Sequence, residues 1–554
     1  MDERDEKLEL TRRTLIGAAA GAAALAGAAP LLGEAPVGGP PPVSTAPHAG
    51  LRPFELAGLG LADLRRGLES GRFTARRLAE LYIERIAAVD RGPDGTHAVA
   101  EVNPDSLALA DQLDAERRAG RVRGPLHGLP ILVKDNIGSA DGMETTAGSL
   151  ALLGARPEKD AFLVRRLRES GALLLGKTNL SEWANFRSTR STSGWSGRGG
   201  QVRNPHALDR NPCGSSSGSG VAAAADLCAA AVGTETDGSI TCPAAMNGVV
   251  GLKPTVGLIS RSGVIPISHT QDTAGPMGRT VEDVALLLGG LAGADLTDPA
   301  TAGSAGHVLT DYTRGLDAKA LAGARLGVVR SFFGWHPEIE RQAEDLLGAL
   351  RAAGAVLVDP LEIPNVTDLD PNEFEVMLYE FKHGLNAYLA QLPDRGQPRT
   401  LSALIEFNRA HAREEMPWFG QELFEQAEGK GPLTEEAYKK ALETALRQAR
   451  AEGLDAAFAG QKVDALVCPT LGPAYPIDWI NGDHYGGSCT SPPAVSGYPH
   501  LTVPAGFVHG LPWGFSFLGP AWSEAKLLAY GHAFELATRA RRAPAFLPTL
   551  PLEV

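Results

Sequence analysis

Hydrophobic residues recur with two different periods along this chain, and each period predicts a different element. In residues 54–90 the apolar positions recur every three or four residues, which predicts two amphipathic helices. Thr74 is a suitable N-cap for the second helix. The apolar face of that helix consists of Leu78, Leu81, Tyr82, Ile86 and Val89. A continuous apolar run at 128–137 is typical of a buried strand, which would deliver Lys134 at its end.

Helical and strand patterns continue to alternate as far as about residue 329. Further helices are predicted at 105–120, 160–170 and 180–186, and a strand is predicted at 172–175. This alternation is expected of an α/β fold. We therefore predict one large α/β domain over residues 51–545, with a mixed central sheet flanked by helices on both faces.

The pattern becomes helical and polar between about residues 362 and 460. Few strand candidates occur there, so we expect a helical excursion that covers the sheet. Strand patterns return at 463–467 and 501–503. A run punctuated by Gly and Pro follows at 510–519, and a final helix is predicted at 523–540.

The first 50 residues differ in composition from the rest of the chain. Arg12 and Arg13 precede an Ala- and Gly-rich run, so residues 1–35 are typical of a twin-arginine export signal. A membrane anchor is disfavoured because Ala and Gly are weakly apolar and Pro30 interrupts the run. Residues 36–50 are rich in Pro and Gly, which predicts a linker. We expect an exported protein that keeps no stable membrane insertion after signal removal.

Composition narrows the possible functions. The chain has 554 residues, 44% hydrophobic and 21% charged, which is enough for a large packed core. Its net charge is −13, and −11 without the predicted signal, which holds six acidic and four basic residues. This acidity argues against a nucleic-acid partner, which usually requires a basic face.

The cysteine and histidine patterns give no sign of a metal or of a disulfide framework. The five cysteines are Cys213, Cys228, Cys242, Cys468 and Cys489. An odd and sparse set in so long a chain does not indicate a disulfide framework. No pair has the CxxC spacing of a zinc site and no HExxH occurs, so we expect no metal ion.

Three short motifs match catalytic patterns but lack the structural context that each requires. Residues 171–178 match G-x4-G-K-T, but the intervening Ala-Leu-Leu-Leu favours a buried strand over a phosphate-binding loop. Residues 214–218 match the G-x-S-x-G nucleophile elbow, yet a polar loop precedes them instead of a strand. Residues 523–526 match S-x-x-K, but the companion K-T-G is absent and Ser523 suits a helix N-cap.

Candidate chemistry is concentrated in residues 211–261. A Gly- and Ser-rich turn, an Ala-rich segment and a second turn at 236–239 follow one another, and we expect one helix to join the two turns. Short hydroxyl side chains on turns with free N–H groups suit a nucleophile beside a developing anion. The alternative is an inert Gly/Ser loop beside a core helix. The ordered combination of Lys134, Ser215 and Ser239 favours the reactive site.

This stretch resembles the amidase signature family, in which a glycine- and serine-rich segment precedes a GGSI-like turn, a P-A pair and GLKPT. The matching positions are 214–216, 238–240, 243–244 and 251–255. The interval between the two matching serines is also the one that the family keeps.

The resemblance implies a Ser–Ser–Lys triad and no cofactor. Ser239 would be the nucleophile, Ser215 the bridging hydroxyl on a cis peptide bond after Gly214, and Lys134 the base. An oxyanion hole would be formed by the backbone N–H groups of Thr236, Asp237, Gly238 and Ser239.

Elementary chemistry sets a condition on Lys134. A serine hydroxyl needs a neighbour to take its proton, and an ammonium cannot do so. Lys134 must therefore be neutral, and burial among apolar neighbours such as Ile131, Leu132, Val133 and Ile137 would lower its pKa. A Lys134 paired with Asp135 at the surface would instead be charged and inert.

Two positions depart from the usual family turn, D-x-G-G-S-I-R. Asp237 stands where a glycine is usual, and Thr241 replaces an arginine that pairs with the aspartate, here Glu235. Together with SEWANFR and SGWSGRGG upstream, the sequence resembles the bacterial peptide amidases, which hydrolyse the C-terminal carboxamide of peptides. This resemblance extends from about residue 56 to 541.

The sequence therefore predicts a serine amidase that releases ammonia from a peptide or small-molecule amide through an acyl-enzyme. Small, aryl or fatty amides are alternative substrates, and the helical excursion is expected to shape the acyl pocket. An amidotransferase component that feeds ammonia to charged tRNA is disfavoured by the predicted export and the acidic charge. A non-catalytic exported binder would be favoured by a charged, exposed Lys134.

Overall fold

The computed structural model describes residues 53–366 and 369–551, all within one compact unit of the chain, Thr45–Val554. The predicted signal at 1–35 and the linker at 36–50 lie outside the described residues.

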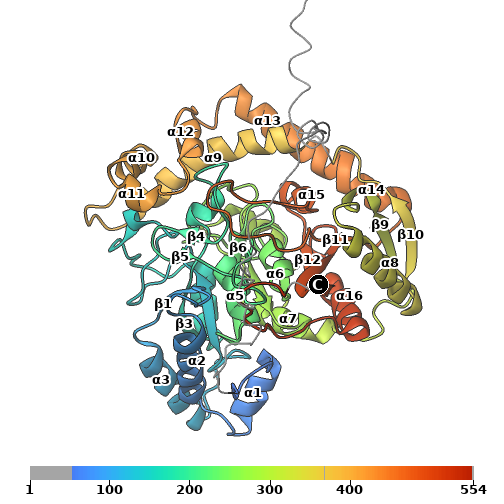
Figure 1. Ribbon diagram of the computed structural model, residues 1–554, viewed down its shortest axis with the longest axis horizontal. Helices are drawn as coiled ribbons and strands as arrows, with labels where there is room; N and C mark the ends of the chain where they lie inside the picture. Colours follow the sequence, from blue (N-terminus) through green and yellow to red (C-terminus); the bar gives the residue numbers. More distant parts are fainter. Residues whose placement is uncertain (1–52, 367–368, 552–554) are drawn as a thin grey trace, which may run out of the picture. The chain divides into compact units, whose positions relative to one another are not determined.

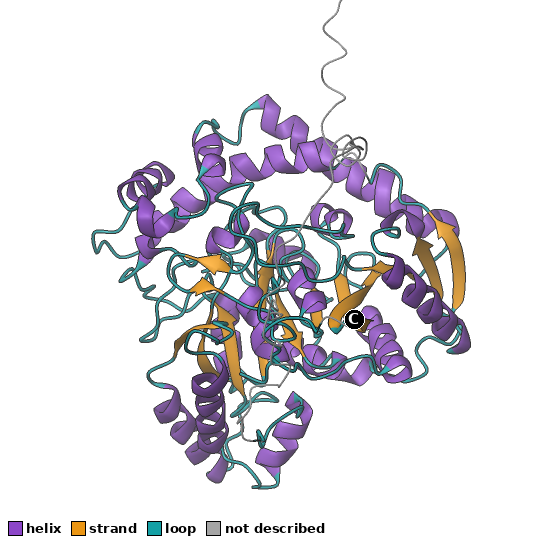
Figure 2. Ribbon diagram, viewed as in Figure 1, coloured by secondary structure: helices purple, strands orange, loops and turns teal. Residues whose placement is uncertain are grey.

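A sheet of eleven strands organises the fold (Figure 2). Its order is β1-β3-β2-β6-β8-β7-β12-β13-β11-β9-β10. The strands are β1 Val99–Val102, β2 Pro130–Lys134, β3 Leu173–Thr178, β6 Ala230–Glu235, β7 Val250–Lys253, β8 Thr273–Gly278, β9 Arg325–Val329, β10 Val356–Leu361, β11 Ala465–Pro469, β12 His500–Val508 and β13 Leu511–Leu518. A separate pair is formed by β4 Trp195–Ser196 and β5 Gly200–Gln201.

The sheet is mixed. The neighbours β2 and β3, β2 and β6, β9 and β10, and β9 and β11 run parallel. The other neighbouring pairs run antiparallel. The predicted class, one large α/β domain with a mixed sheet flanked by helices, is confirmed.

The flanking helices include those that the hydrophobic pattern predicted near the start of the domain. They are α1 Leu61–Glu69, α2 Ala75–Val89, α3 Ser106–Arg118, α4 Phe162–Glu169, α5 Ser217–Ala224, α6 Thr241–Met246, α7 Val281–Leu291, α8 Pro337–Ala352, α15 Ser491–Ser496 and α16 Glu524–Thr538. Thr74 caps α2, since its hydroxyl accepts a hydrogen bond from the Arg77 N–H at 3.0 Å. The predicted apolar face of α2 is buried throughout.

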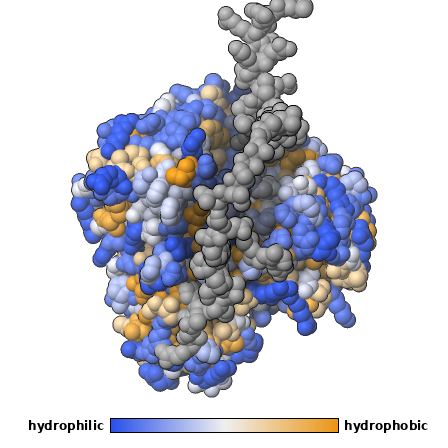
Figure 3. All heavy atoms as spheres, viewed as in Figure 1, coloured by the Kyte–Doolittle hydropathy of each residue, from blue (hydrophilic) through white to orange (hydrophobic). Residues whose placement is uncertain are grey.

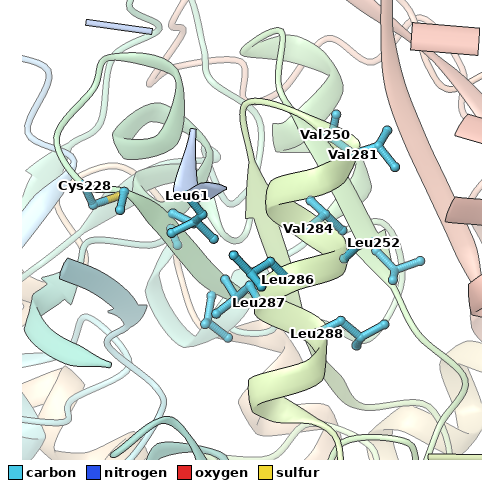
Figure 4. Close-up of a cluster of buried hydrophobic side chains, with 14 of the residues drawn as sticks. Leu61, Cys228, Val250, Leu252, Val281, Val284, Leu286, Leu287 and Leu288 are labelled. Atoms are coloured by element: carbon cyan, nitrogen blue, oxygen red, sulfur yellow. The ribbon is translucent and has the colours of Figure 1, made fainter. Parts of the chain in front are cut away.

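The largest hydrophobic cluster lies between the sheet and its helices. Figure 4 shows a part of it, where Val284 and Leu287 of α7 lie near Leu252 of β7 and Leu61 of α1. Burial of one such side chain stabilises the fold by about 1.5–3 kcal/mol. This packing holds the central strands, and with them the candidate site, in one rigid framework.

Between β10 and β11 the chain forms a helical segment that spans residues 370–461. It consists of α9 Asp370–Gln391, α10 Leu401–Ala410, α11 Ala412–Glu415, α12 Glu422–Glu428, α13 Glu436–Ala449, the π-helical turn Arg450–Leu454 and α14 Asp455–Gln461. In Figure 1 it is the yellow and orange group, in which α9 and α13 run side by side. Its apolar residues pack with Trp183, Phe186 and Ile265, which lie in loops. This part of the segment therefore covers loops, whereas we expected it to cover the sheet.

Two sequence-based expectations about elements are wrong. Residues 180–186 do not form a regular helix but a tight turn, in which Trp183 and Ala184 adopt left-handed backbone angles. Tertiary contacts impose this turn, because the Trp183 N–H donates to the Ala147 carbonyl at 2.8 Å and the indole packs against Phe424.

The second error concerns the Ala-rich segment, which is not one helix. The helix α5 ends at Ala224, and the chain then turns and enters the central strand β6. Pairing with β2 on one side and β8 on the other overrides the helical propensity of alanine.

The run at 510–519, for which no element was predicted from the sequence, contains the strand β13. Gly514 is small because a Cβ there would lie 2.4 Å from the Thr502 hydroxyl on β12. Its glycine thus marks a close approach between strands.

The visible described surface is mainly hydrophilic, with hydrophobic side chains in small groups (Figure 3). Within the described residues, no helix combines the length and apolar character that a membrane crossing requires.

Candidate active site

Lys134 ends β2, an interior strand of the sheet. Every residue of Pro130–Lys134 is buried, because β2 lies between β3 and β6. The Lys134 Nζ lies 2.8 Å from the Ser215 Oγ, 2.9 Å from the Thr234 Oγ1 and 3.3 Å from the Thr234 carbonyl oxygen. The strand that the sequence predicted thus delivers its lysine directly to a predicted serine.

Burial lowers the pKa of Lys134 to about 7, against the opposing effects of Glu235 and Asp272. Asp135 does not pair with Lys134, since its carboxylate accepts hydrogen bonds from Arg198 at 2.8 Å and from the Thr146 hydroxyl at 2.5 Å. The alternative of a charged, exposed lysine paired with Asp135 is therefore wrong. A lysine in this environment is available as a neutral amine near neutral pH.

Ser215 lies two residues before the start of α5, and the peptide bond between Gly214 and Ser215 is cis. Its carbonyl accepts a hydrogen bond from the Ser181 N–H at 3.1 Å. Gly214 has no room for a side chain, because a Cβ there would lie 2.2 Å from the Ser181 hydroxyl. The close packing of these two loops fixes the Ser215 hydroxyl beside Lys134.

Ser239 lies on the turn between β6 and α6, next to the loop of Ser215. Its carbonyl accepts a hydrogen bond from the Ser216 N–H at 3.0 Å. Across the described part of the chain, its hydroxyl makes no hydrogen bond, and neither do the N–H groups of Asp237, Gly238 and Ser239. The turn therefore presents a hydroxyl and several unpaired donors, the combination that an oxyanion hole needs.

Gly238 allows this turn to form. Its φ is +77°, a left-handed angle that glycine adopts without strain. A Cβ at Gly238 would also lie 2.9 Å from the Cys242 sulfur.

The residues at which this chain departs from the family turn make defined hydrogen bonds. The Glu235 carboxylate accepts hydrogen bonds from the N–H groups of Ile240 at 2.7 Å and Thr241 at 3.0 Å, and from the Thr241 hydroxyl at 3.3 Å. Here Thr241, a neutral residue, takes the place beside the carboxylate that an arginine usually has. The Asp237 carboxylate accepts from the Ser491 hydroxyl of α15 at 2.7 Å, and burial raises its pKa to about 6.

A cavity of about 220 Å³ is lined by Ser215, whereas Lys134 and Ser239 are not among its lining residues. Ser215, Thr234 and Thr236 form one part of its wall, and Ile265 and Ile267 form an apolar part. A mainly apolar cavity with a few convergent polar groups is typical of a site for a small ligand.

Several residues of the site were missed by sequence reasoning. Thr234 holds Lys134 and also accepts a hydrogen bond from the Asn136 side chain at 2.9 Å. Asp272 accepts from the Thr236 hydroxyl at 2.6 Å, and Gln271 and Glu373 lie nearby. No motif marks these positions. The one available signal was the closeness of Asn136 to Lys134 in the sequence, which could have placed Asn136 near the site.

The structure agrees with the sequence-based interpretation of the three short motifs at 171–178, 214–218 and 523–526. Leu173–Thr178 is a buried strand and forms no phosphate loop. A loop, and not a strand, leads directly into residues 214–218. Ser523 precedes α16, although its side chain makes no capping hydrogen bond.

In the part of the chain that it describes, the structure contains neither a disulfide nor a cluster that could bind a metal ion. Each of the five cysteines is a buried free thiol. Among the described residues, no group of His, Cys, Asp and Glu side chains could hold a metal ion.

Fold and site together define an α/β hydrolytic enzyme with a buried lysine, two serines and a donor-rich turn. A family model described as Amidase matches residues 77–528, so the chain belongs to the amidase family. It is an enzyme, a hydrolase of carbon–nitrogen bonds other than peptide bonds. The family resemblance predicted from the motifs is confirmed.

Named sequence relatives and similar solved structures support this assignment. The chain is 41% identical over 503 residues to a probable amidase of Arabidopsis thaliana, covering 89% of this chain and 93% of the relative. The structure of native peptide amidase from Stenotrophomonas maltophilia matches with a TM-score of 0.85 and 52% identity, covering 89% of this chain and 100% of that one. A glutamyl-tRNA(Gln) amidotransferase subunit of Halorhodospira halophila is 36% identical over 492 residues, covering 86% of this chain and 97% of the relative.

Proposed function

We propose that this amidase works through Ser239 as nucleophile, Ser215 as proton bridge and Lys134 as base. The observation that carries the proposal is the 2.8 Å contact between the Lys134 Nζ and the Ser215 Oγ in a fully buried setting. A pKa of about 7 leaves a large fraction of the amine neutral at neutral pH, as proton acceptance requires.

In the first half of the reaction the Ser239 Oγ forms a bond to the carbonyl carbon of the amide. Its proton passes to Ser215 as the Ser215 proton passes to Lys134. The anionic oxygen of the tetrahedral intermediate accepts hydrogen bonds from the turn at 236–239, and one such donor is worth about 2.7–4 kcal/mol in the transition state.

In the second half the carbon–nitrogen bond breaks and ammonia leaves with a proton returned through Ser215. A water molecule then attacks the Ser239 ester and gives up a proton along the same path. The carboxylic acid is released, and Ser239 and Lys134 return to their starting states. The steps need no oxidant, reductant or metal.

We propose peptides with a C-terminal carboxamide as substrates. This choice is supported by the 52% identity to the Stenotrophomonas peptide amidase, whose whole length this chain covers. The TDGSI turn, in which Asp237 replaces the usual glycine, belongs to the same resemblance. Small, aryl and fatty amides are the alternatives that a substrate panel would separate.

The decisive experiment is ammonia release from a C-terminally amidated dipeptide by the wild type and by Ser239→Ala. Ser219→Ala is a matched control, because Ser219 is also a buried serine, lies on α5 and donates to the Val232 carbonyl at 3.1 Å. We expect Ser239→Ala to lose activity and Ser219→Ala to keep it. Activity in Ser239→Ala would overturn the proposed nucleophile, and wild-type release from simple amides alone would overturn the peptide substrate.

A role in a glutamyl-tRNA(Gln) amidotransferase is the second candidate, because of the 36% identity to the Halorhodospira protein. It predicts glutamine as ammonia donor and a stable complex with a partner. Glutamine hydrolysis that exceeds dipeptide-amide hydrolysis would favour this candidate. The reverse ratio would favour the peptide amidase.

A further inference from the structure

The orientation of one peptide group decides whether Asp237 can donate to an oxyanion. The carbonyl of Thr236 and the N–H of Asp237 belong to the same planar trans peptide unit, so they point in opposite directions. Whatever holds the Thr236 carbonyl on one side therefore aims the Asp237 N–H toward the other. In this structure the Gln271 Nε2 lies 3.5 Å from that carbonyl oxygen, as a long hydrogen bond.

Gln271 is itself held by the helical segment. The same Nε2 donates to the Glu373 Oε1 at 2.7 Å, which an amide nitrogen with two hydrogens can do while also donating to Thr236. Both side chains are buried, with exposures of 2% for Gln271 and 4% for Glu373. Glu373 lies in the first turn of α9, so a residue far along the sequence reaches the turn of the proposed nucleophile.

The remaining contacts hold the same turn at other points. The Thr236 hydroxyl donates to the Asp272 Oδ1 at 2.6 Å, and the other Asp272 oxygen accepts from the N–H groups of Ile267 at 2.8 Å and Ser268 at 2.9 Å. The Asp237 side chain is bound by Ser491. Side-chain contacts thus hold both residues, and the long hydrogen bond from Gln271 is made to the peptide group between them.

We propose that Gln271 and Glu373 are positioning residues for oxyanion stabilisation, through which α9 aims the Asp237 N–H at the reacting carbonyl oxygen. The proposal rests on the proposed function, because it assigns the turn at 236–239 to the oxyanion. Neither residue touches the reacting atoms. Their effect should appear in the transition state and leave ground-state substrate binding nearly unchanged.

Three variants and one control test this role. Gln271→Met keeps the approximate size of the side chain but removes both donors, and Glu373→Ala removes the acceptor. Glu373→Gln keeps an amide oxygen that can accept from Gln271. Glu375→Ala is the matched control, since Glu375 is a carboxylate on the same helix that binds Lys430 at 2.7 Å instead of the site.

Loss of a whole oxyanion donor costs about 10²–10³-fold in kcat, so misalignment of one donor should cost roughly tenfold or more. We expect this loss of kcat, with KM within about twofold, in Gln271→Met and Glu373→Ala. Glu373→Gln should recover most of the activity, and Glu375→Ala should match the wild type. Thermal unfolding of each variant shows whether it is folded.

The inhibition constant of a peptidyl aldehyde provides a further test, because a purely structural role of these residues would not change it. The aldehyde forms a tetrahedral adduct with a serine nucleophile, so its inhibition constant should rise in proportion to the loss of kcat/KM. Folded Gln271→Met and Glu373→Ala variants with wild-type kcat would overturn the proposal. A kcat loss with unchanged aldehyde inhibition, or without recovery in Glu373→Gln, would overturn it as well. Failure of the proposed function itself is distinguishable, because it would appear as ammonia release by Ser239→Ala.

Discussion

Lys134 and Lys177 lie on neighbouring strands and share most of their physical setting. Lys134 ends β2, and Lys177 lies in β3, where it pairs in register with Val133. Both side chains are fully buried, and burial lowers the pKa of Lys134 to about 7 and that of Lys177 to about 8. Burial within the sheet therefore gives the two lysines similarly lowered pKa values.

Their neighbours differ. The Lys177 Nζ donates to the Ile137 carbonyl oxygen at 2.5 Å and to the Thr145 hydroxyl at 2.9 Å, and neither residue lines the cavity. Lys134 instead contacts Ser215 and Thr234, which both line it. A carbonyl oxygen only accepts hydrogen bonds, whereas a serine hydroxyl can also give up its proton. A lowered pKa thus does not make a base unless a reactive hydroxyl and a cavity adjoin it.

The largest contrast is expected from replacing each lysine by methionine. Lys134→Met should lower kcat/KM for amide hydrolysis by about 10²–10⁴-fold, because the proton acceptor is lost. Lys177→Met should keep the activity of each folded molecule but lower the free energy of unfolding by about 1–3 kcal/mol, because the Ile137 carbonyl loses its donor. Ammonia release and urea unfolding measure the two effects. Equal losses of activity in the two variants would remove the distinction between the lysines.

The pH dependence of kcat/KM should follow Lys134 and not Lys177. Below a pKa of about 7 the protonated amine cannot take the Ser215 proton, so activity should fall about tenfold per pH unit as the pH decreases. Above it the neutral amine dominates and this limb levels off. The same limb should persist in Lys177→Met. A profile that stays flat on both sides of pH 7, with chemistry rate-limiting, would contradict the assignment of Lys134 as base.

A smaller effect is expected from the threonine beside each lysine. Thr234→Val removes the hydroxyl that lies 2.9 Å from the Lys134 Nζ, and we expect kcat to fall about tenfold while KM changes little, because the amine loses its orientation. Thr145→Val removes the corresponding partner of Lys177 and should cost only about 1 kcal/mol of stability. Steady-state kinetics and thermal unfolding of both variants test the pair. Similar kinetic losses in both would show that the effect arises from general loosening of the sheet.

The local parts of the fold followed from the sequence. The face of α2, its Thr74 cap and the strand that carries Lys134 each rest on a pattern within one short stretch. The left-handed turn at Trp183 and the strand β6 did not follow, because tertiary contacts override local propensity there. The site shows the same division: Lys134, Ser215 and Ser239 belong to motifs, whereas Thr234, Asp272 and Glu373 belong to none.

The sequence by itself determined that β2 is buried on both faces, because an uninterrupted apolar run cannot leave one face in water. Burial already implied a lowered pKa for Lys134, and the motif serines implied the family. Only the tertiary structure decided that Asp135 pairs with Arg198, that Thr234 holds the amine, and that α9 reaches the turn of Ser239 through Gln271. These contacts join elements far apart in the chain, and no local periodicity specifies which of many polar side chains will meet when the sheet, its loops and the helical segment pack together.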